Sequence, residues 1–377
     1  MLKRFSVEGF KNFENKVAID FSDVRDYKFN TECITNGLLS TAVIYGKNAV
    51  GKSNFGLALF DIVSHLTMNN VTPRLYDYYM NVKNGKGYAE FEYAFQFNED
   101  EIVYRYRKKS DQTMCYEYLE LNSETQFEMN DNTNIQPHWF AGFDFHNLFD
   151  LLPTLNLEQY RGGSLLKFIF YSTTMGNNNP YSKMLRFVNN MLWFRCLDEN
   201  RFIGYKETSR DYFDFIFEKK EYIDEFNVLL KQSGIDEPVV GKKDADRETR
   251  LYYYDKTPIP FFKVASSGTR ALYNFYYWYK TAPDVSFMYI DEFDAFYHYE
   301  LSETIVGILE KMPGFQKILT SHNTNLLSNR IMRPDCYFIL TKDNLTSLAN
   351  ATERELREGH NLEKLYMSLS QNTIRIY

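Results

Sequence analysis

Apolar and polar residues follow strand periodicity toward both ends of the chain and helical periodicity in its middle. Period-two alternation predicts strands over 2–10 and 17–21 and an antiparallel meander over 88–118. Apolar residues at helical spacing predict helices over Ser182–Leu197 and Glu218–Ser233. The C-terminal part predicts strands over 251–254, 260–264, 285–290, 318–320 and 336–340, and helices over 269–280, 299–311 and 352–369.

Composition places the chain among ordinary globular proteins. Of 377 residues, 44% are apolar and 25% are charged, and the net charge of −7 gives no overall basic signature for nucleic acid. The four cysteines are far apart, which excludes a disulfide framework and a zinc cluster. No signal peptide or apolar run of membrane-spanning length is present. We therefore expect a reduced, cytoplasmic protein without a membrane partner.

One loop carries a phosphate-binding motif in its proper setting. The sequence GKNAVGKS, residues 46–53, lies between an apolar strand over 42–45 and a helical pattern. Its two glycines let backbone N–H groups curl around an anion, Lys52 can reach the β- and γ-phosphates, and the Ser53 hydroxyl can bind Mg²⁺. The predicted nucleotide-binding residues of this segment are Gly46, Asn48, Gly51, Lys52, Ser53 and Asn54.

A second acidic segment completes the metal side of such a site. The apolar strand over 287–290 ends in Asp291 and Glu292. Asp291 can hold Mg²⁺, and Glu292 can act as the catalytic base that polarises the attacking water. These acids follow Lys52 at a much greater distance than in small GTPases or hexameric AAA+ motors. The gap fits the ABC class, in which a helical insertion divides the nucleotide-binding domain.

Two further features occur in the order that this class requires. Ser266, Ser267 and Gly268 open a predicted helix just before the acidic strand, where they can present a hydroxyl and N–H groups to a γ-phosphate. Simple N-capping of the helix is the alternative role for these residues. A short strand over 318–320 then leads to His322, which we interpret as a catalytic switch histidine.

On these motifs the chain resembles ABC ATPases of the SMC and DNA-repair type, and more narrowly the compact prokaryotic AAA family proteins of phage-defence operons. The resemblance implies an α/β, ABC-type P-loop domain with a mixed sheet, an antiparallel β-meander, a helical insertion and no long coiled coil. Its implied parts are lobe I over 1–150, the insertion over 151–245 and lobe II over 246–377. The matching segments are GFKNF (9–13), GKNAVGKS (46–53), SSGT (266–269), IDEFDAFYH (290–298), TSH (320–322) and HNLEKLY (360–366).

The same resemblance implies a homodimer that hydrolyses ATP, with Mg²⁺, to ADP and phosphate. Each ATP would lie between the P-loop of one subunit and the Ser267–Gly268 segment of the other, and such dimers can assemble further. Lys11, Asp294 and His298 would also lie near the nucleotide. The chain departs from the family by having SSGT in place of Ser-Gly-Gly. The glutamine that usually links lobe I to Mg²⁺ is not placed, its candidates being Gln96, Gln126 and Gln136.

Three hypotheses describe what the ATPase does. By resemblance, the first is a sensor or scaffold that restrains or activates a separate effector, a nuclease or toxin encoded in the same operon, in response to a phage protein or nucleic acid. The second is a stand-alone, repair-type ATPase that binds DNA. The third is ribonuclease activity, based on the spacing of Arg354 and His360, although the HNLEKLY segment already accounts for His360.

Overall fold

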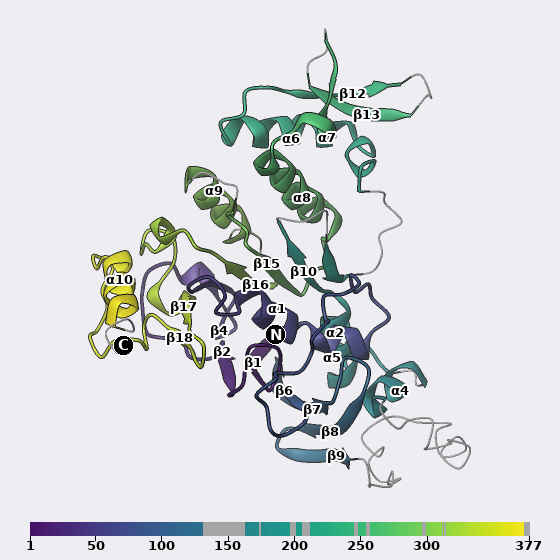
Figure 1. Cartoon of the computed structure of the whole chain (residues 1–377), viewed down its shortest axis with the longest axis vertical. Helices are drawn as coiled ribbons and strands as arrows, with labels where there is room; N and C mark the ends of the chain where they lie inside the picture. Colours follow the sequence, from purple (N-terminus) through teal and green to yellow (C-terminus); the bar gives the residue numbers. More distant parts are fainter. Residues whose placement is uncertain are drawn as a thin grey trace.

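Two large sheets form the body of the protein, which is known here from a computed structural model (Figure 1). One is a six-stranded antiparallel sheet and the other is a seven-stranded mixed sheet. A three-stranded sheet and a two-stranded sheet accompany them. The structure describes residues 1–130, 163–172, 175–196, 201–205, 212–244, 248–253, 257–295, 299–310, 312 and 314–372.

The antiparallel sheet is built from the predicted meander and the N-terminal strands. Its order is β2-β1-β6-β7-β8-β9, and every described pairing within it is antiparallel. Buried and partly exposed residues alternate along much of β6 and β8, as expected where one face of a sheet meets water. The strands are Leu2–Glu8 (β1), Val17–Asp20 (β2), Ala89–Phe97 (β6), Asp100–Lys108 (β7), Met114–Leu121 (β8) and Glu124–Asn130 (β9).

The mixed sheet has the order β11-β10-β15-β16-β5-β17-β18. Its five inner strands are parallel, while the edge strands β11 and β18 pair antiparallel with their neighbours. β5, β15 and β16 are buried along their whole length, which is typical of a sheet covered on both faces. The strands are Thr41–Tyr45 (β5), Met191–Arg195 (β10), Phe202–Gly204 (β11), Phe287–Asp291 (β15), Gln316–Thr320 (β16), Tyr337–Leu340 (β17) and Leu345–Ser347 (β18). The predicted α/β class with a mixed sheet and an antiparallel meander is therefore confirmed.

Helices cover the mixed sheet and connect it to the smaller sheets (Figure 1). α1 and α2 lie between the two large sheets, and α8 lies between the mixed sheet and the three-stranded sheet. The helices are Lys52–Leu59 (α1), Asp61–Leu66 (α2), Leu165–Ser172 (α4), Pro180–Asn189 (α5), Lys220–Gln232 (α6), Phe261–Val264 (α7), Ser267–Thr281 (α8), Tyr299–Glu310 (α9) and Leu362–Asn372 (α10). The small sheets contain Val239–Lys243 (β12), Thr249–Tyr253 (β13) and Ile259–Pro260 (β14), and Ile34–Thr35 (β3) and Leu38–Leu39 (β4).

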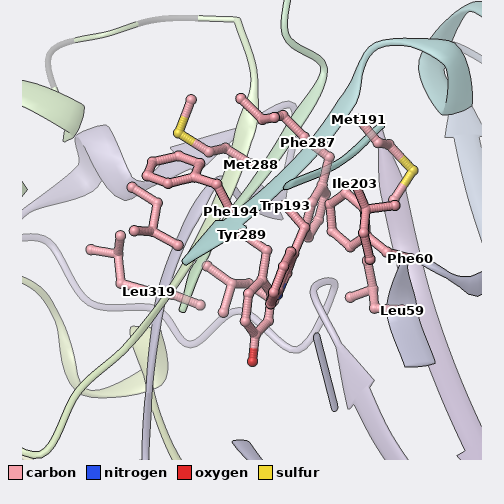
Figure 2. Close-up of a cluster of buried hydrophobic side chains, with 14 of the residues drawn as sticks. Leu59, Phe60, Met191, Trp193, Phe194, Ile203, Phe287, Met288, Tyr289 and Leu319 are labelled. Carbon is pink, nitrogen blue, oxygen red and sulfur yellow. The ribbon is translucent and has the colours of Figure 1, made fainter. Parts of the chain in front are cut away.

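The core beneath α1 is made of large side chains from both the helix and the sheet. Figure 2 shows Leu59 and Phe60, at the end of α1, beside Trp193 of β10 and Tyr289 of β15. A Cβ atom added to Gly56 would lie 2.6 Å from the Tyr289 ring and 2.9 Å from the Trp193 indole nitrogen. Glycine at this position therefore allows α1 to approach the sheet closely. The Tyr289 hydroxyl donates to the carbonyl of Lys52 at 2.7 Å and so fixes the first residue of α1.

Three predicted elements are wrong at their boundaries. The helix expected over Ser182–Leu197 ends at Asn189, and residues 191–195 form β10 instead. Residues 260–264, expected as a strand, are mostly the short helix α7, which begins just after Pro260. The C-terminal helix begins at Leu362 rather than near Thr352. The first correction matters most, because β10 is a parallel neighbour of β15 in the central sheet.

The region 151–245 is consequently not a purely helical insertion. β10 and β11 lie within it and belong to the mixed sheet, and β12 belongs to the three-stranded sheet. The boundaries of the three predicted parts remain predictions. All four cysteines are free, as expected. Within the described ranges, none of the helices is both long and apolar enough to traverse a bilayer.

Candidate functional site

The P-loop, the two predicted acids and His322 converge at one edge of the mixed sheet. β10 ends at Arg195, β15 at Asp291 and β16 at Thr320, and β5 leads directly into the 46–51 loop. The strands are parallel, with Arg195 paired with Asp291 and Thr320 with Ile44 of β5. Because parallel strands present their carboxyl ends at the same edge, segments from three distant parts of the sequence meet there. This edge is where ligands bind in open α/β sheets.

The 46–51 loop has the curled backbone that an anion-binding loop requires. Ala49 has φ 63° and Gly51 has φ 107°, both in the left-handed region. Asn12, which the sequence analysis did not single out, donates from Nδ2 to the Val50 carbonyl at 2.8 Å and accepts from Asn54 Nδ2 at 2.7 Å. Asn54 therefore shapes the loop through Asn12. Asn48 is exposed on the loop. Successive backbone N–H groups in such turns form a concave site for phosphate oxygens.

Lys52 bends back over the loop that precedes it. Its Nζ donates to the Gly46 carbonyl at 2.9 Å and lies 3.5 Å from Nδ1 of His322. Burial lowers the pKa of Lys52, and the carboxylates of Asp291 and Glu292 oppose that shift. Burial, and then the nearby Lys52 charge, lower the pKa of His322. The predicted phosphate-binding amine and the predicted switch histidine are thus adjacent.

The two acids differ sharply in their surroundings. Asp291 is fully buried, and its Oδ1 accepts a hydrogen bond from the Thr320 hydroxyl at 3.0 Å. The same hydroxyl oxygen accepts from the backbone N–H of Glu292 at 2.7 Å. Glu292 has φ 53°, a left-handed conformation that is rare for a residue with a side chain. Its side chain is 24% exposed although Oε2 is buried, so the turn at the strand end leaves this side chain only partly open to solvent.

Arg195 is a second residue of the site that the sequence analysis did not single out. Its Nη2 donates to Ser53 Oγ at 3.1 Å, and its Nε lies 3.1 Å from Asp291 Oδ2. One guanidinium therefore contacts both residues predicted to bind metal, so their oxygens flank a single cationic position. Hydroxyl and carboxylate oxygens at such a position suit Mg²⁺. In the described part of the chain, no group of three or more His, Cys, Asp or Glu side chains is suited to a metal.

Two predicted nucleotide contacts have other partners. The Lys11 amine donates to the Asp77 carbonyl at 2.6 Å, and burial lowers the pKa of Lys11. Asp294 is buried and accepts a hydrogen bond from the Ser321 hydroxyl, next to His322. Burial raises the pKa of Asp294. The side chain of Asp294 thus faces the end of β16. His298 lies outside the described residues.

The Ser266–Gly268 segment starts α8 as predicted. Ser266 is the N-cap, and its Oγ accepts from the Thr269 N–H at 3.2 Å, so the N-capping alternative explains this residue. Ser267 is exposed and Gly268 is partly exposed. α8 directly follows α7, which packs against β13 and β14, and this end of α8 lies beside the three-stranded sheet, away from α1 (Figure 1). Ser267 and Gly268 are therefore available to a partner.

None of the glutamine candidates that the structure describes reaches the site. The Gln96 amide donates to the Asn98 and Asp100 carbonyls in a turn of the antiparallel sheet, and Gln126 is partly exposed on β9. Gln136 lies outside the described residues. Arg354 and His360 are neighbours, with Nη2 and Nε2 3.3 Å apart, but His360 Nδ1 accepts the Arg357 N–H in a surface turn.

Comparison with known proteins gives one family match and several likenesses of fold. Residues 174–328 match the model described as "AAA domain, putative AbiEii toxin, Type IV TA system". This range contains Arg195, Asp291 and His322 and excludes the P-loop. Comparison with curated proteins gives no match.

Three solved SMC head structures are similar to this chain along most of its length. The SMC head domain from Thermotoga maritima is 15% identical with a TM-score of 0.42, covering 94% of this chain and 99% of that one. The head domain with an extended coiled coil bound to the C-terminal domain of ScpA, derived from Pyrococcus furiosus, is 15% identical with a TM-score of 0.43 and covers 99% of both chains. A head bound to the C-winged helix domain of ScpA is also 15% identical, with a TM-score of 0.43, and covers 92% of this chain and 97% of the other. At 15% sequence identity, these similarities concern the fold alone.

Proposed function

We propose that the protein binds ATP with Mg²⁺ at the carboxyl edge of the mixed sheet and hydrolyses it to ADP and phosphate. One observation carries this proposal. A curled P-loop, a fully buried aspartate, a partly exposed glutamate and a histidine from three distant segments meet around Lys52. A P-loop alone would support only binding, whereas the added acids supply the groups that hydrolysis requires.

Each residue then has a definite role. Lys52 and the N–H groups of the loop would hold the phosphates. Ser53 and Asp291 would hold Mg²⁺, which when bound neutralises charge on the phosphate oxygens. Glu292 would orient and polarise water, because its side chain is partly exposed and it follows the proposed metal-binding aspartate directly. His322 lies next to Lys52 and would contact the terminal phosphate.

We further propose that a second copy of the chain completes the site. Ser267 and Gly268 open α8 at a distance from α1 of the same chain, and the N-terminus of a helix favours a phosphate group. A two-fold dimer would place the start of α8 of each copy against the P-loop of the other. ATP would then hold the two copies together.

The catalytic assignment is tested with Glu292→Gln and Lys52→Ala. Glu292→Gln should bind ATP with an affinity close to that of the wild type but hydrolyse it about a hundredfold more slowly, because loss of water activation affects the chemical step. Lys52→Ala should weaken binding itself. Measurements of nucleotide affinity and phosphate release separate the two effects. Glu124→Gln, an exposed glutamate on β9, is the control and should behave like the wild type. Normal turnover by Glu292→Gln would refute the assignment.

For the cellular role we propose a sensor or scaffold that controls a separate effector encoded beside it, in defence against phage. The family description that matches residues 174–328 names a toxin and a toxin–antitoxin system, which is compatible with this context. Co-expression with the neighbouring gene should yield a complex and a change in phage plating that depends on Glu292. A monodisperse ATPase that forms no complex, with no effect of the neighbouring gene on plating, would count against this role. DNA-stimulated hydrolysis would favour a repair-type ATPase instead.

A further inference from the structure

The Arg195 guanidinium lies close to the Ser53 hydroxyl and to both carboxylates, Asp291 and Glu292, at the proposed metal position. Its Nη2 donates to Ser53 Oγ at 3.1 Å, and its Nε lies 3.1 Å from Asp291 Oδ2 and 3.7 Å from Glu292 Oε2. These are the two proposed metal ligands and the proposed catalytic carboxylate. The side chain therefore lies at the chemical centre of the site, although no nucleotide-binding motif in the sequence includes it.

The fold fixes the backbone of Arg195 and leaves its side chain room to move. Arg195 is paired with Asp291 in the parallel register of β10 and β15, and the Cys196 N–H donates to the Asp291 carbonyl at 3.3 Å. From α8, the Asn274 amide donates to the Arg195 carbonyl at 3.2 Å. The arginine side chain itself is 28% exposed. The guanidinium can therefore exchange its partners without any change in the sheet.

Electrostatics explains why a cation lies there when no nucleotide is bound. Asp291 is fully buried, and a buried carboxylate is unfavourable unless it is paired and hydrogen-bonded. Thr320 supplies one hydrogen bond, and the Arg195 guanidinium supplies the opposite charge. Lys52, the other nearby cation, donates instead to the Gly46 carbonyl. Arg195 thus stabilises the acidic side of the site in the absence of metal.

Mg²⁺ and this guanidinium compete for the same oxygens. A divalent ion bound to Ser53 and Asp291 would lie within a few ångströms of the arginine charge, where repulsion between cations is strong. Resting on the proposed function, we propose that Arg195 is a built-in counter-cation of the magnesium position. Mg·ATP must displace it from Asp291, and the displaced guanidinium then binds a phosphate oxygen of the nucleotide. Arginine suits the second role because its planar fork matches phosphate geometry.

The proposal predicts two effects of opposite sign for Arg195→Gln. Without the competing charge, the Mg²⁺ concentration at half-saturation in the presence of ADP should fall by about tenfold. At saturating Mg²⁺, where the displaced guanidinium would be a phosphate ligand, loss of that ligand should weaken ADP binding by several-fold. Both are measured by fluorescence titration of a labelled ADP, with and without Mg²⁺. A residue that only stabilises the fold would not move these affinities in opposite directions.

Two further variants make the test independent of folding. Arg195→Lys keeps a positive charge, but a lysine amine cannot bridge Ser53 and Asp291 together. The Mg²⁺ concentration at half-saturation should therefore fall by only about threefold. Arg105→Gln is the control. It removes an arginine whose side chain is 34% exposed, against 28% for Arg195, and whose guanidinium lies 2.5 Å from Glu92 on the antiparallel sheet. Its Mg²⁺ and nucleotide affinities should match those of the wild type. Heating in EDTA should unfold Arg195→Gln at a lower temperature than the wild type. Mg²⁺ alone should restore more stability to the variant than to the wild type.

The outcomes separate this proposal from the one on which it rests. If the wild type binds Mg·ADP and both Arg195 variants keep its magnesium dependence, the counter-cation proposal is wrong and the nucleotide site stands. If Arg195→Gln needs more Mg²⁺ than the wild type, the guanidinium assists the metal, which also overturns the proposal. If the wild type binds no nucleotide with or without Mg²⁺, the proposed function fails and the role of Arg195 fails with it.

Discussion

Asp61 and His65, both on α2, form an ionisable pair with Asp61 Oδ2 3.7 Å from His65 Nδ1. Asp61 is fully buried, lies 2.8 Å from Lys108 Nζ and accepts the hydroxyls of Tyr79 and Tyr106 at 2.9 Å each. Burial opposes ionisation of Asp61, but Lys108 and His65 outweigh it and lower its pKa to about 2. Burial, followed by the Lys108 charge, lowers the pKa of His65 to about 4. In the folded protein, His65 therefore stays neutral at pH values well below its usual pKa.

This pair predicts an acid-sensitive fold. The unfolded chain protonates His65 near pH 6.5, whereas the folded protein does so only near pH 4, so the unfolded state binds more protons between these values. The free energy of unfolding should fall by about 2 kcal/mol across that window, and further below pH 4 as Asp61 is protonated. Urea unfolding at a series of pH values measures the slope.

His65→Gln, which cannot titrate, should flatten the slope between pH 6.5 and 4, and His360→Gln, in the turn before α10, should leave it unchanged. An identical slope in wild type and His65→Gln would exclude this histidine as the cause.

At the scale of elements, the contact of α1 with β10 and β15 positions the P-loop. Gly56 makes that contact possible, since an added Cβ would lie 2.6 Å from the buried Tyr289 ring. Gly56→Ala should destabilise the protein by about 2 kcal/mol, because overpacking outweighs the gain in helix propensity. Because Tyr289 also bonds to the Lys52 carbonyl, ATP affinity should fall with stability.

Gly307→Ala in α9 is the matched control, because nothing lies within 4 Å of its added Cβ. In Gly307→Ala the gain in helix propensity is not opposed by overpacking, so the free energy of unfolding should rise by up to about 1 kcal/mol. Thermal unfolding of both variants measures the contrast. Equal effects of the two substitutions would show that α1 does not pack against Tyr289 as described.

The elements also show why sequence reasoning located most of the site but missed Arg195. The P-loop, the acidic strand end and the switch histidine each carry local chemistry that a motif reveals. Arg195 follows Met191–Phe194, a run that continues the apolar spacing of α5. A strand buried on both faces has no alternation, so its periodicity cannot be told from that of a helix. Its role appears only when the register places it beside Asp291.

Asn12 was missed for a different reason. Its contacts with Val50 and Asn54 join the N-terminal segment to the P-loop across a long stretch of sequence. The GFKNF segment matches the family, but it does not show which of its residues contacts the P-loop, because that contact depends on the three-dimensional packing of this segment against the loop. Conversely, the neighbouring Lys11 was predicted to lie near the nucleotide, but its amine donates to the Asp77 carbonyl instead.

At the scale of the whole molecule, the nucleotide site and the start of α8 are separate regions linked by one helix. α8 begins at Ser267, away from α1, and its Asn274 side chain bonds to the carbonyl of Arg195. This hydrogen bond ties the middle of α8 to the backbone of Arg195 at the metal position.

This arrangement predicts dimers that form only with ATP. Glu292→Gln, which would bind ATP without hydrolysing it, should be a dimer in ATP and a monomer in ADP, as measured by light scattering during size-exclusion chromatography. Adding Ser267→Arg should abolish the dimer while the monomer still binds ATP, because a bulky cation at the exposed start of α8 would block the opposite P-loop. Ser368→Arg, at an exposed serine of α10, should leave the dimer intact. If Ser267→Arg still dimerises in ATP, the second copy must approach through another surface, and the phosphate contact from α8 would have to be abandoned.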